Sequence, residues 1–216
     1  MPTLNALALY LPVALIMAVT PGPATLFVLS RASSLGPRAG LLSAAGLLTG
    51  TLALVALAAV GLSGILAGAP LAFDVIKTAG AAYLIYLGLR TVVASKRSAG
   101  LAAVASGPRD GRHRSAPRLY RDGVVTELFN PKAALFYASV LPQFVDARRP
   151  DVPLQMFTLG AIFVVFGAVS LGLIAVFAGS LQARLRRSSA WQAAARWLSG
   201  AVLVALGVRL AVSRAR

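Results

Sequence analysis

Six long apolar runs divide this chain of 216 residues. They cover residues 4–29, 40–66, 74–94, 121–144, 154–178 and 192–212. A helix of about 20 apolar residues spans the ~30 Å hydrocarbon core of a bilayer. Only 12% of the residues are charged, whereas ordinary soluble domains contain about 25%. The pattern therefore predicts an all-α integral membrane protein with six transmembrane helices.

Basic residues are unevenly distributed among the connections between these runs. The first, third and fifth connections hold Arg31, Arg38, Lys96, Arg97, Arg109, Arg112, Arg114, Arg118, Arg121, Arg184, Arg186 and Arg187. The opposite side holds only Arg148, Arg149, Arg214 and Arg216. Cytoplasmic connections of membrane proteins carry the excess of Lys and Arg. We therefore expect a multi-pass protein of a bacterial-type cytoplasmic (inner) membrane with both termini outside.

The longest polar stretch lies midway along the chain. Residues 96–121 are rich in Arg, Gly, Ser and Pro, and we expect them to form a basic cytoplasmic linker. This linker would join a first three-helix repeat, residues 1–95, to a second, residues 122–216. An odd number of spans in each half inverts the second half relative to the first, so the prediction is two inverted three-helix repeats.

Glycines recur at helical spacing in several of the runs, as at Gly46 and Gly50 of the second and at Gly160 and Gly167 of the fifth. Such spacings allow helix backbones to approach closely in a membrane. We interpret them as packing contacts and assign them no chemistry.

Two proline breaks interrupt the first and fourth runs at matching places. Pro21-Gly22-Pro23 precedes Ala24, Leu26 and Phe27, and Asn130-Pro131-Lys132 precedes the identical set Ala133, Leu135 and Phe136, 109 positions later. A proline in a helix removes one backbone hydrogen bond, and in lipid the freed groups must find other partners. A single such break is commonly a packing kink. The second, matched break favours a transporter built by duplication, with its site where the halves meet.

The breaks predict exposed backbone groups deep in the membrane. Pro21, Pro23 and Pro131 leave the carbonyls of Met17, Val19 and Glu127 without their usual donors. The residues that precede these prolines, Thr20, Gly22 and Asn130, are biased toward extended backbone. Free carbonyls suit an ammonium group, and the N-terminus of a resumed helix suits a carboxylate. An amino-acid zwitterion carries both groups.

Two charged side chains flank the second break. Glu127 is the most deeply placed of only six acidic residues, and a carboxylate at that depth is expensive unless it is paired or protonated. Alternatively, the fourth span begins later and Glu127 lies near the cytoplasmic interface. Lys132 could pair with Glu127, bind a substrate carboxylate, or act as a counter-charge. The predicted substrate or ion path is Thr20, Pro21, Gly22, Pro23, Glu127, Asn130, Pro131 and Lys132.

Several functional classes find no support in the sequence. The chain has no cysteine, which excludes disulfides and thiolate metal sites. It contains no hydrolase elbow, no metalloprotease histidine pair and no phosphate-binding glycine loop. Its net charge of +15 is explained by lipid headgroups rather than nucleic acid. We expect no enzyme, no catalytic residues, no metal and no cofactor, and we expect a small-molecule substrate and membrane lipid as partners.

Four ordered blocks resemble the LysE/RhtB family of amino-acid exporters. They are TPGP at 20–23, IKTAGAAYLIYLGLR at 76–90, FNPKAALF at 129–136 and LPQF at 141–144. The resemblance implies a six-helix inner-membrane protein that exports amino acids or close derivatives, with the proton gradient as the usual energy source. Many members carry an acidic residue where this chain has Thr51. If that carboxylate contributes to coupling elsewhere, this chain must rely on Glu127 or differ in substrate.

The leading hypothesis is thus a secondary exporter of amino acids or close derivatives, coupled to the proton gradient, whose halves rock around the broken middles of the first and fourth spans. One alternative is an exporter of another small solute or cation, which freed carbonyls would coordinate. Another is a non-transporting membrane scaffold whose basic linker binds a partner or anionic lipid.

Overall fold

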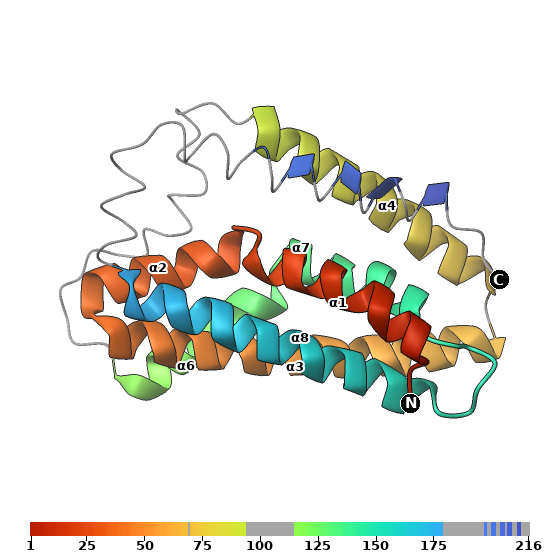
Figure 1. Ribbon diagram of the computed structural model, residues 1–216, viewed down its shortest axis with the longest axis horizontal. Coiled ribbons are helices and arrows are strands. Elements are labelled where there is room, and N and C mark those ends of the chain that lie inside the picture. Colours follow the sequence, from red (N-terminus) through yellow and green to blue (C-terminus); the bar gives the residue numbers. More distant parts are fainter. Residues whose placement is uncertain are drawn as a thin grey trace.

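The computed structural model describes residues 1–68, 70–93 and 115–178, and also residues 197, 200, 201, 204, 205, 207, 208, 211 and 212. In these parts of the chain the regular structure is helical and contains no strand, as predicted. The elements are α1 (Leu4–Val19), α2 (Pro23–Leu35), α3 (Pro37–Gly68), α4 (Pro70–Val93), α6 (Ala116–Leu128), α7 (Pro131–Leu135), the π-helix η1 (Phe136–Val140), the 3₁₀ helix η2 (Leu141–Phe144) and α8 (Val152–Val176). Figure 1 shows an elongated helical bundle with α4 along one side.

Among the helices of the described residues, two are long and apolar enough to cross a membrane, in the stretches Pro37–Gly61 of α3 and Val152–Val176 of α8. The pair α1 and α2 passes the same test as one span bent by 44°. Large apolar side chains remain exposed along these helices, for example Leu57 of α3 and Val165 of α8. A bilayer is the solvent that suits such surfaces. The chain is a multi-pass membrane protein.

The fourth predicted run differs most from a simple span, because it is divided among α6, α7, η1 and η2. Helix α6 begins at Ala116, so Arg118 and Arg121 lie on a helix rather than in the connecting segment that was predicted to reach residue 121. Pro117 in the first turn suits a helix start, since its missing N–H is not needed there. Linker residues 96–114 and most of the sixth run lie outside the described residues.

The two broken segments run antiparallel to each other. Near the start of α1, the ring of Tyr10 meets that of Phe144 in η2 edge-on, with centroids 5.2 Å apart. Near the end of α2, Arg31 pairs with Asp122 of α6 at 3.6 Å. The first segment therefore begins where the second ends (Figure 1). This arrangement brings the two breaks to the same level of the bundle.

Other helices form antiparallel pairs through glycine. Val55 of α3 opposes Gly160 of α8, and about two turns further along the pair Leu48 opposes Gly167. On α4, a Cβ added to Gly88 would lie 2.7 Å from the carbonyl oxygen of Gly200. The absence of side chains at these positions lets the helices approach closely.

Helices α3 and α6 make the tightest of these contacts. A Cβ at Gly46 would lie 2.0 Å from the carbonyl oxygen of Tyr120, and one at Gly50 would lie 2.8 Å from Cβ of Glu127. On the facing helix, a Cβ at Gly123 would lie 2.3 Å from the carbonyl oxygen of Ser43. The glycines predicted to pack helices thus fix the helix that carries Glu127.

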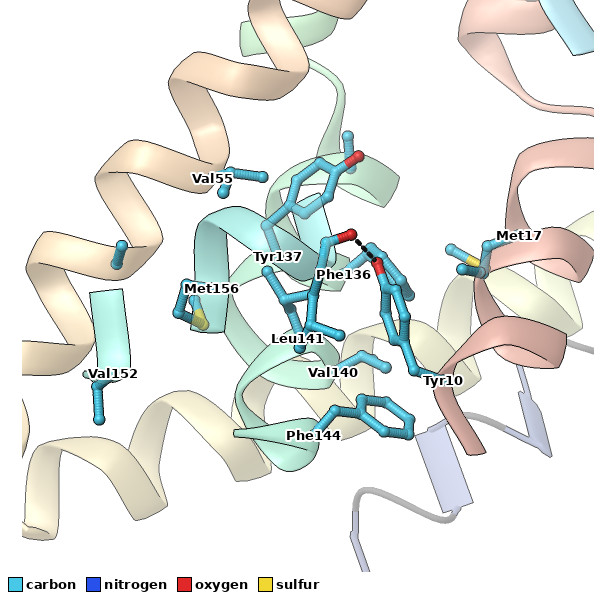
Figure 2. Packing of buried hydrophobic residues seen from close by; sticks show 14 of the residues in the cluster. Tyr10, Met17, Val55, Phe136, Tyr137, Val140, Leu141, Phe144, Val152 and Met156 are labelled. Carbon is cyan, nitrogen blue, oxygen red and sulfur yellow. Dashed lines mark hydrogen bonds between the residues drawn. The ribbon is translucent and has the colours of Figure 1, made fainter. Parts of the chain in front are cut away.

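Two apolar clusters occupy opposite ends of α8. The first cluster joins residues of α1, α3, α4, α7, η1, η2 and the start of α8, among them Tyr10, Phe136, Tyr137 and Met156 (Figure 2). The Tyr10 hydroxyl is satisfied within this cluster because it donates to the carbonyl of Leu159 at 2.9 Å. The second cluster joins α2, α3 and the end of α8, and its members are Phe27, Val28, Leu29, Ala32, Ala44, Leu47, Leu171, Ala175 and Ala178.

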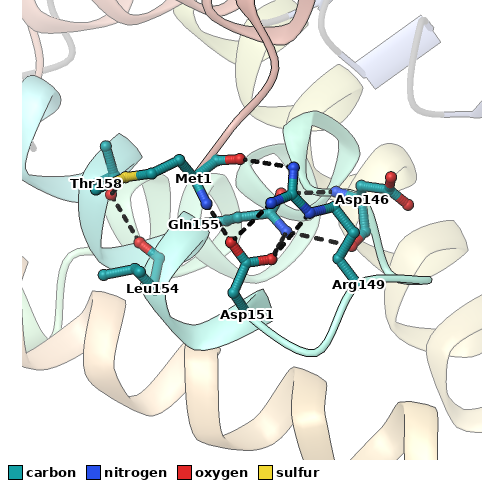
Figure 3. Close-up of polar contacts among 7 residues, drawn as sticks. All are labelled: Met1, Asp146, Arg149, Asp151, Leu154, Gln155 and Thr158. Atoms are coloured by element: carbon teal, nitrogen blue, oxygen red, sulfur yellow. Dashed lines mark hydrogen bonds and ion pairs between the residues drawn. The ribbon is translucent and has the colours of Figure 1, made fainter.

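A polar cluster closes the end of the molecule where α1 begins (Figure 3). The N-terminal ammonium of Met1 contacts Asp151, and Arg149 donates to the Met1 carbonyl at 3.2 Å. Buried Gln155 donates to Asp151 at 2.9 Å and accepts from the Asp146 amide, also at 2.9 Å. The hydrogen bond from the ammonium group holds the pKa of the Asp151 carboxyl below its ordinary value. The chain start and the η2–α8 connection therefore lie at one end of the bundle.

Candidate functional site

The first break, between α1 and α2, is a short stretch of non-helical backbone at residues 20–22. Thr20 and Gly22 are extended, with φ/ψ of −62°/118° and −157°/−170°. The Thr20 amide and hydroxyl both donate to the carbonyl of Ile16, at 2.8 and 2.6 Å. Helix α2 resumes at Pro23 with Gly22 as its N-cap, so no side chain caps its first turn. Its first amides are free to bind another acceptor.

The second break, between α6 and α7, is closed by its own side chain. Asn130 is extended, and its Oδ1 accepts from the amide of Lys132 at 3.2 Å, which caps α7. Its backbone amide donates to the Glu127 carbonyl at 3.0 Å. The carbonyl that Pro131 was predicted to free is therefore already satisfied.

The carboxylate of Glu127 is buried at this second break. The residue is 5% exposed, and its Oε2 accepts from Asn130 Nδ2 at 3.1 Å. Its Oε1 accepts from the hydroxyl of Thr51 on α3 at 3.3 Å. Tyr137, also buried, interacts through its side chain with Thr51. A carboxylate that is buried away from water needs hydrogen-bond donors, and Glu127 has two.

The ammonium of Lys132 reaches across to the first break. Its Nζ donates to the carbonyls of Met17 at 3.3 Å and of Thr20 at 3.1 Å. The side chain passes over Gly22, where an added Cβ would meet its Cδ at 3.3 Å and Nζ at 3.4 Å. Among the described ion pairs, none joins Lys132 to Glu127, although pairing was one of the predicted roles. The freed carbonyl of Met17 is confirmed, and its partner is a lysine from the other half.

A cavity of about 60 Å³ lies between the breaks. A cavity needs roughly 10–15 Å³ to hold one water molecule, so this one is large enough to hold water. Its polar lining comes from Thr20, Thr51, Glu127, Asn130 and Lys132. Its apolar walls belong to both clusters and to neighbouring residues, namely Met17, Ala18, Leu47, Leu48, Ala133, Phe136, Tyr137, Phe163, Gly167 and Leu171.

Six of the eight residues on the predicted path line this cavity: Thr20, Gly22, Pro23, Glu127, Asn130 and Lys132. Pro21 and Pro131 are exposed and lie outside it. Their effect on the site is indirect, because a proline acts through the donor that it lacks and the backbone that it bends.

Three polar residues in or beside the site were not predicted from the sequence. Thr51 was noted only as a departure from the family pattern, and Tyr137 lies in the unexpected π-helix η1. Ser170 of α8 donates to the Ala18 carbonyl at 3.1 Å, next to the first break. A polar residue in an otherwise apolar run was the available signal for Thr51 and Ser170. In the part of the chain that the structure describes, no group of three or more His, Cys, Asp or Glu side chains is placed to hold a metal.

Comparison with known proteins identifies the family of this chain. The family model for the LysE type translocator matches residues 15–214. The chain is 28% identical over 212 residues to the uncharacterized membrane protein YrhP of Bacillus subtilis, a match that covers 97% of this chain and all of that protein. It is 34% identical over 150 residues to the leucine efflux protein of Salmonella typhimurium, covering 69% of this chain and 68% of that one. No solved structure matches. The resemblance drawn from the four sequence blocks is confirmed: this chain belongs to the LysE type translocator family.

Proposed function

We propose that this protein is a secondary transporter that exports amino acids or close derivatives from the cytoplasm, driven by the proton gradient. One observation carries the proposal: two broken helices from opposite halves of the chain meet at a single buried cavity that contains both a cation and a carboxylate. Broken helices that meet in this way are the usual construction of substrate sites in secondary transporters.

The polar groups of the cavity match the two ends of a zwitterion. The carbonyls of Met17 and Thr20 are acceptors for an α-ammonium group. The uncapped start of α2, where Ala24 and Thr25 line the cavity, offers amides and a positive helix end to an α-carboxylate. An amino acid would thus bind along the first break.

The walls of the cavity favour an apolar substrate side chain. Leu47, Phe136 and Phe163 line it, and the charged groups lie on the side of the breaks. The efflux proteins at 34% identity are named for leucine. We therefore propose leucine and similar apolar amino acids as the first substrates to test. The present 60 Å³ space must widen to admit them.

The architecture that we propose is six spans arranged as two inverted three-helix repeats. Three antiparallel pairings support it: the broken segments with each other, α3 with α8, and α4 with the segment around Gly200. Rocking of one repeat against the other would separate first one apolar cluster and then the other. The cavity would thereby open alternately to the two sides of the membrane.

The orientation that we propose places both termini outside an inner membrane. Basic residues favour a cytoplasmic position for the connection between α2 and α3, which lies between Arg31 and Arg38, and for the start of α6. The Arg31–Asp122 ion pair supports a common side for these two segments. The contact between Met1 and Arg149 supports the opposite side for the N-terminus and the η2–α8 connection.

Glu127 is the proposed proton carrier. It is buried, faces the cavity, and is held by neutral donors rather than by a direct ion pair. In the arrangement described, where Lys132 binds the carbonyls of Met17 and Thr20, protonation of this carboxylate breaks no direct ion pair. The proposal requires no covalent chemistry and no cofactor.

Transport by reconstituted protein tests this function. Proteoliposomes would be loaded with radiolabelled leucine, or with other members of an amino-acid panel, and placed in a more acidic external buffer. We expect leucine efflux that the pH gradient accelerates and that protein-free liposomes lack. If no member of the panel shows gradient-dependent flux, the proposal is wrong.

A further inference from the structure

The cation in the cavity is neutralised in an unusual way. Lys132 is 9% exposed and shares the cavity with Glu127, yet its ammonium binds two main-chain carbonyls instead of the carboxylate. Carbonyl dipoles neutralise a buried ammonium less completely than a carboxylate would. This arrangement needs an explanation beyond charge balance.

The Lys132 ammonium has the same chemistry as the ammonium of an amino acid. Each is a primary ammonium group with three N–H donors. The carbonyls of Met17 and Thr20, which the proposed function assigns to the substrate, are therefore already filled by the protein's own cation. Two ammonium groups on the same pair of oxygens would repel each other, so a substrate amine and Lys132 compete for this position.

The cavity offers Lys132 a second position. Each oxygen of the Glu127 carboxylate accepts one hydrogen bond, from Thr51 or from Asn130, and carboxylate oxygens can accept more. The lysine stem is flexible, and it crosses Gly22, where no side chain obstructs it. The ammonium can therefore exchange partners inside the cavity.

We propose that Lys132 is a tethered stand-in for the ammonium group of the substrate. It occupies the carbonyls of the first break when the site is empty and moves to Glu127 when an amine-bearing substrate displaces it. This inference rests on the proposed function for its ligand. It adds that the substrate must carry a primary ammonium, and that binding at one break changes the partner of the acidic residue at the other.

The substrate-free state of the protein is stabilised by this arrangement. Unfilled carbonyls in a buried cavity would attract a metal cation or an ammonium ion from solution. With Lys132 in place, these oxygens are satisfied and no external cation is needed. The same lysine competes with the substrate, so it lowers the apparent affinity by the fraction of time that it fills the site.

Removal of the lysine should accordingly tighten binding. Lys132→Met keeps a similar length and removes the charge, and water can satisfy the carbonyls in a cavity of this size. If Lys132 fills the site about nine-tenths of the time, the Kd for leucine falls about tenfold. Isopentylamine, which lacks the carboxylate, should gain similarly, and 4-methylpentanoate, which lacks the ammonium, should not. Titration calorimetry on protein in nanodiscs measures all three ligands.

Loss of affinity for both leucine and 4-methylpentanoate in Lys132→Met would overturn the inference, because it would place Lys132 on the substrate carboxylate. A second measurement is made on the wild-type protein and uses the variant only to assign a signal. The chain has three lysines, Lys77, Lys96 and Lys132, so Nζ-¹⁵N labelling gives few ammonium signals to resolve. Leucine should move the signal that Lys132→Met removes, and it should leave the other two unchanged.

These results separate the inference from the proposed function. If leucine binds and the Lys132 signal does not move, the inference fails while export of amino acids stands. If leucine does not bind, leucine is the wrong substrate, and isopentylamine still decides the inference. An unmoved Lys132 signal with bound isopentylamine, or no binding of isopentylamine to the wild type and to Lys132→Met, overturns it.

Discussion

The two proline breaks share a sequence pattern but differ in how their hydrogen bonds are satisfied. At the second break, Asn130 caps α7 and also donates to Glu127. At the first break, Gly22 stands at the N-cap and provides no side chain, and the carbonyls rely on Lys132 from the other break. One break is closed by local bonds, and the other depends on a distant residue.

Under the proposed function, this difference gives the two breaks distinct tasks. A break that needs an external partner is suited to exchange that partner for a ligand. A break that is capped locally is suited to fix the backbone from which Glu127 and Lys132 extend.

The largest expected effect comes from displacing the helix that carries the second break. Gly46→Ala would place Cβ 2.0 Å from the Tyr120 carbonyl oxygen, so α3 and α6 must move apart. Overpacking costs about 1–3 kcal/mol, and more where backbone must shift. We expect loss of monodisperse protein in detergent. Gly61→Ala on the same helix meets nothing within 4 Å and should leave the melting temperature unchanged or raised. Equal behaviour of the two variants would contradict the tight contact.

The next effect concerns the charge at the second break. Glu127→Gln retains the shape but cannot carry a proton: its amide oxygen can still accept from Asn130, and its NH2 group can donate to the Thr51 hydroxyl. We expect gradient-driven leucine efflux to disappear and leucine exchange at equal pH to survive in part. Asp146→Asn, on the exposed η2–α8 connection, is the control and should transport normally. If efflux by Glu127→Gln depends on pH as in the parent, Glu127 has no part in coupling.

A substitution at Gly22 makes the first break resemble the second. Serine caps a helix about as well as asparagine, so Gly22→Ser should occupy the α2 amides that we assign to the substrate carboxylate. Its Cβ would also press on Lys132 at 3.3 Å. We expect a stable protein with a Kd for leucine raised about fivefold, or about 1 kcal/mol. Gly172→Ser on α8, where nothing lies within 4 Å, is the control. Unchanged affinity in Gly22→Ser would remove the α2 amides from the site.

The smallest effect is expected at Thr51. Thr51→Val removes one long hydrogen bond, 3.3 Å, to Glu127. Its loss should weaken gradient-driven efflux a few-fold, in line with about 1 kcal/mol for such a bond. Thr51→Ser retains the hydroxyl and should restore the rate. If valine and serine variants transport equally, the hydroxyl does not support the carboxylate.

Much of the fold follows from local pattern, but not every proline marks a break. Pro12 lies inside the continuous helix α1, whereas Pro21-Gly22-Pro23 interrupts the chain. Two prolines around a glycine remove two donors and leave extended backbone as the favoured state, so this motif was a sound predictor. The π-helix η1, which turns Phe136 and Tyr137 into the core, had no comparable local signal.

The sequence by itself determined the membrane class, the positions of both breaks and the family, because span length, proline and motif spacing are local properties of the chain. It also identified most of the residues that line the cavity. Only the tertiary structure decided which groups are partners. Lys132 binds Met17 and Thr20 from more than a hundred positions away, and Thr51 reaches Glu127 across the α3–α6 contact. Such pairings depend on how antiparallel broken helices cross and on how closely glycines let backbones approach, and neither is encoded in any one segment.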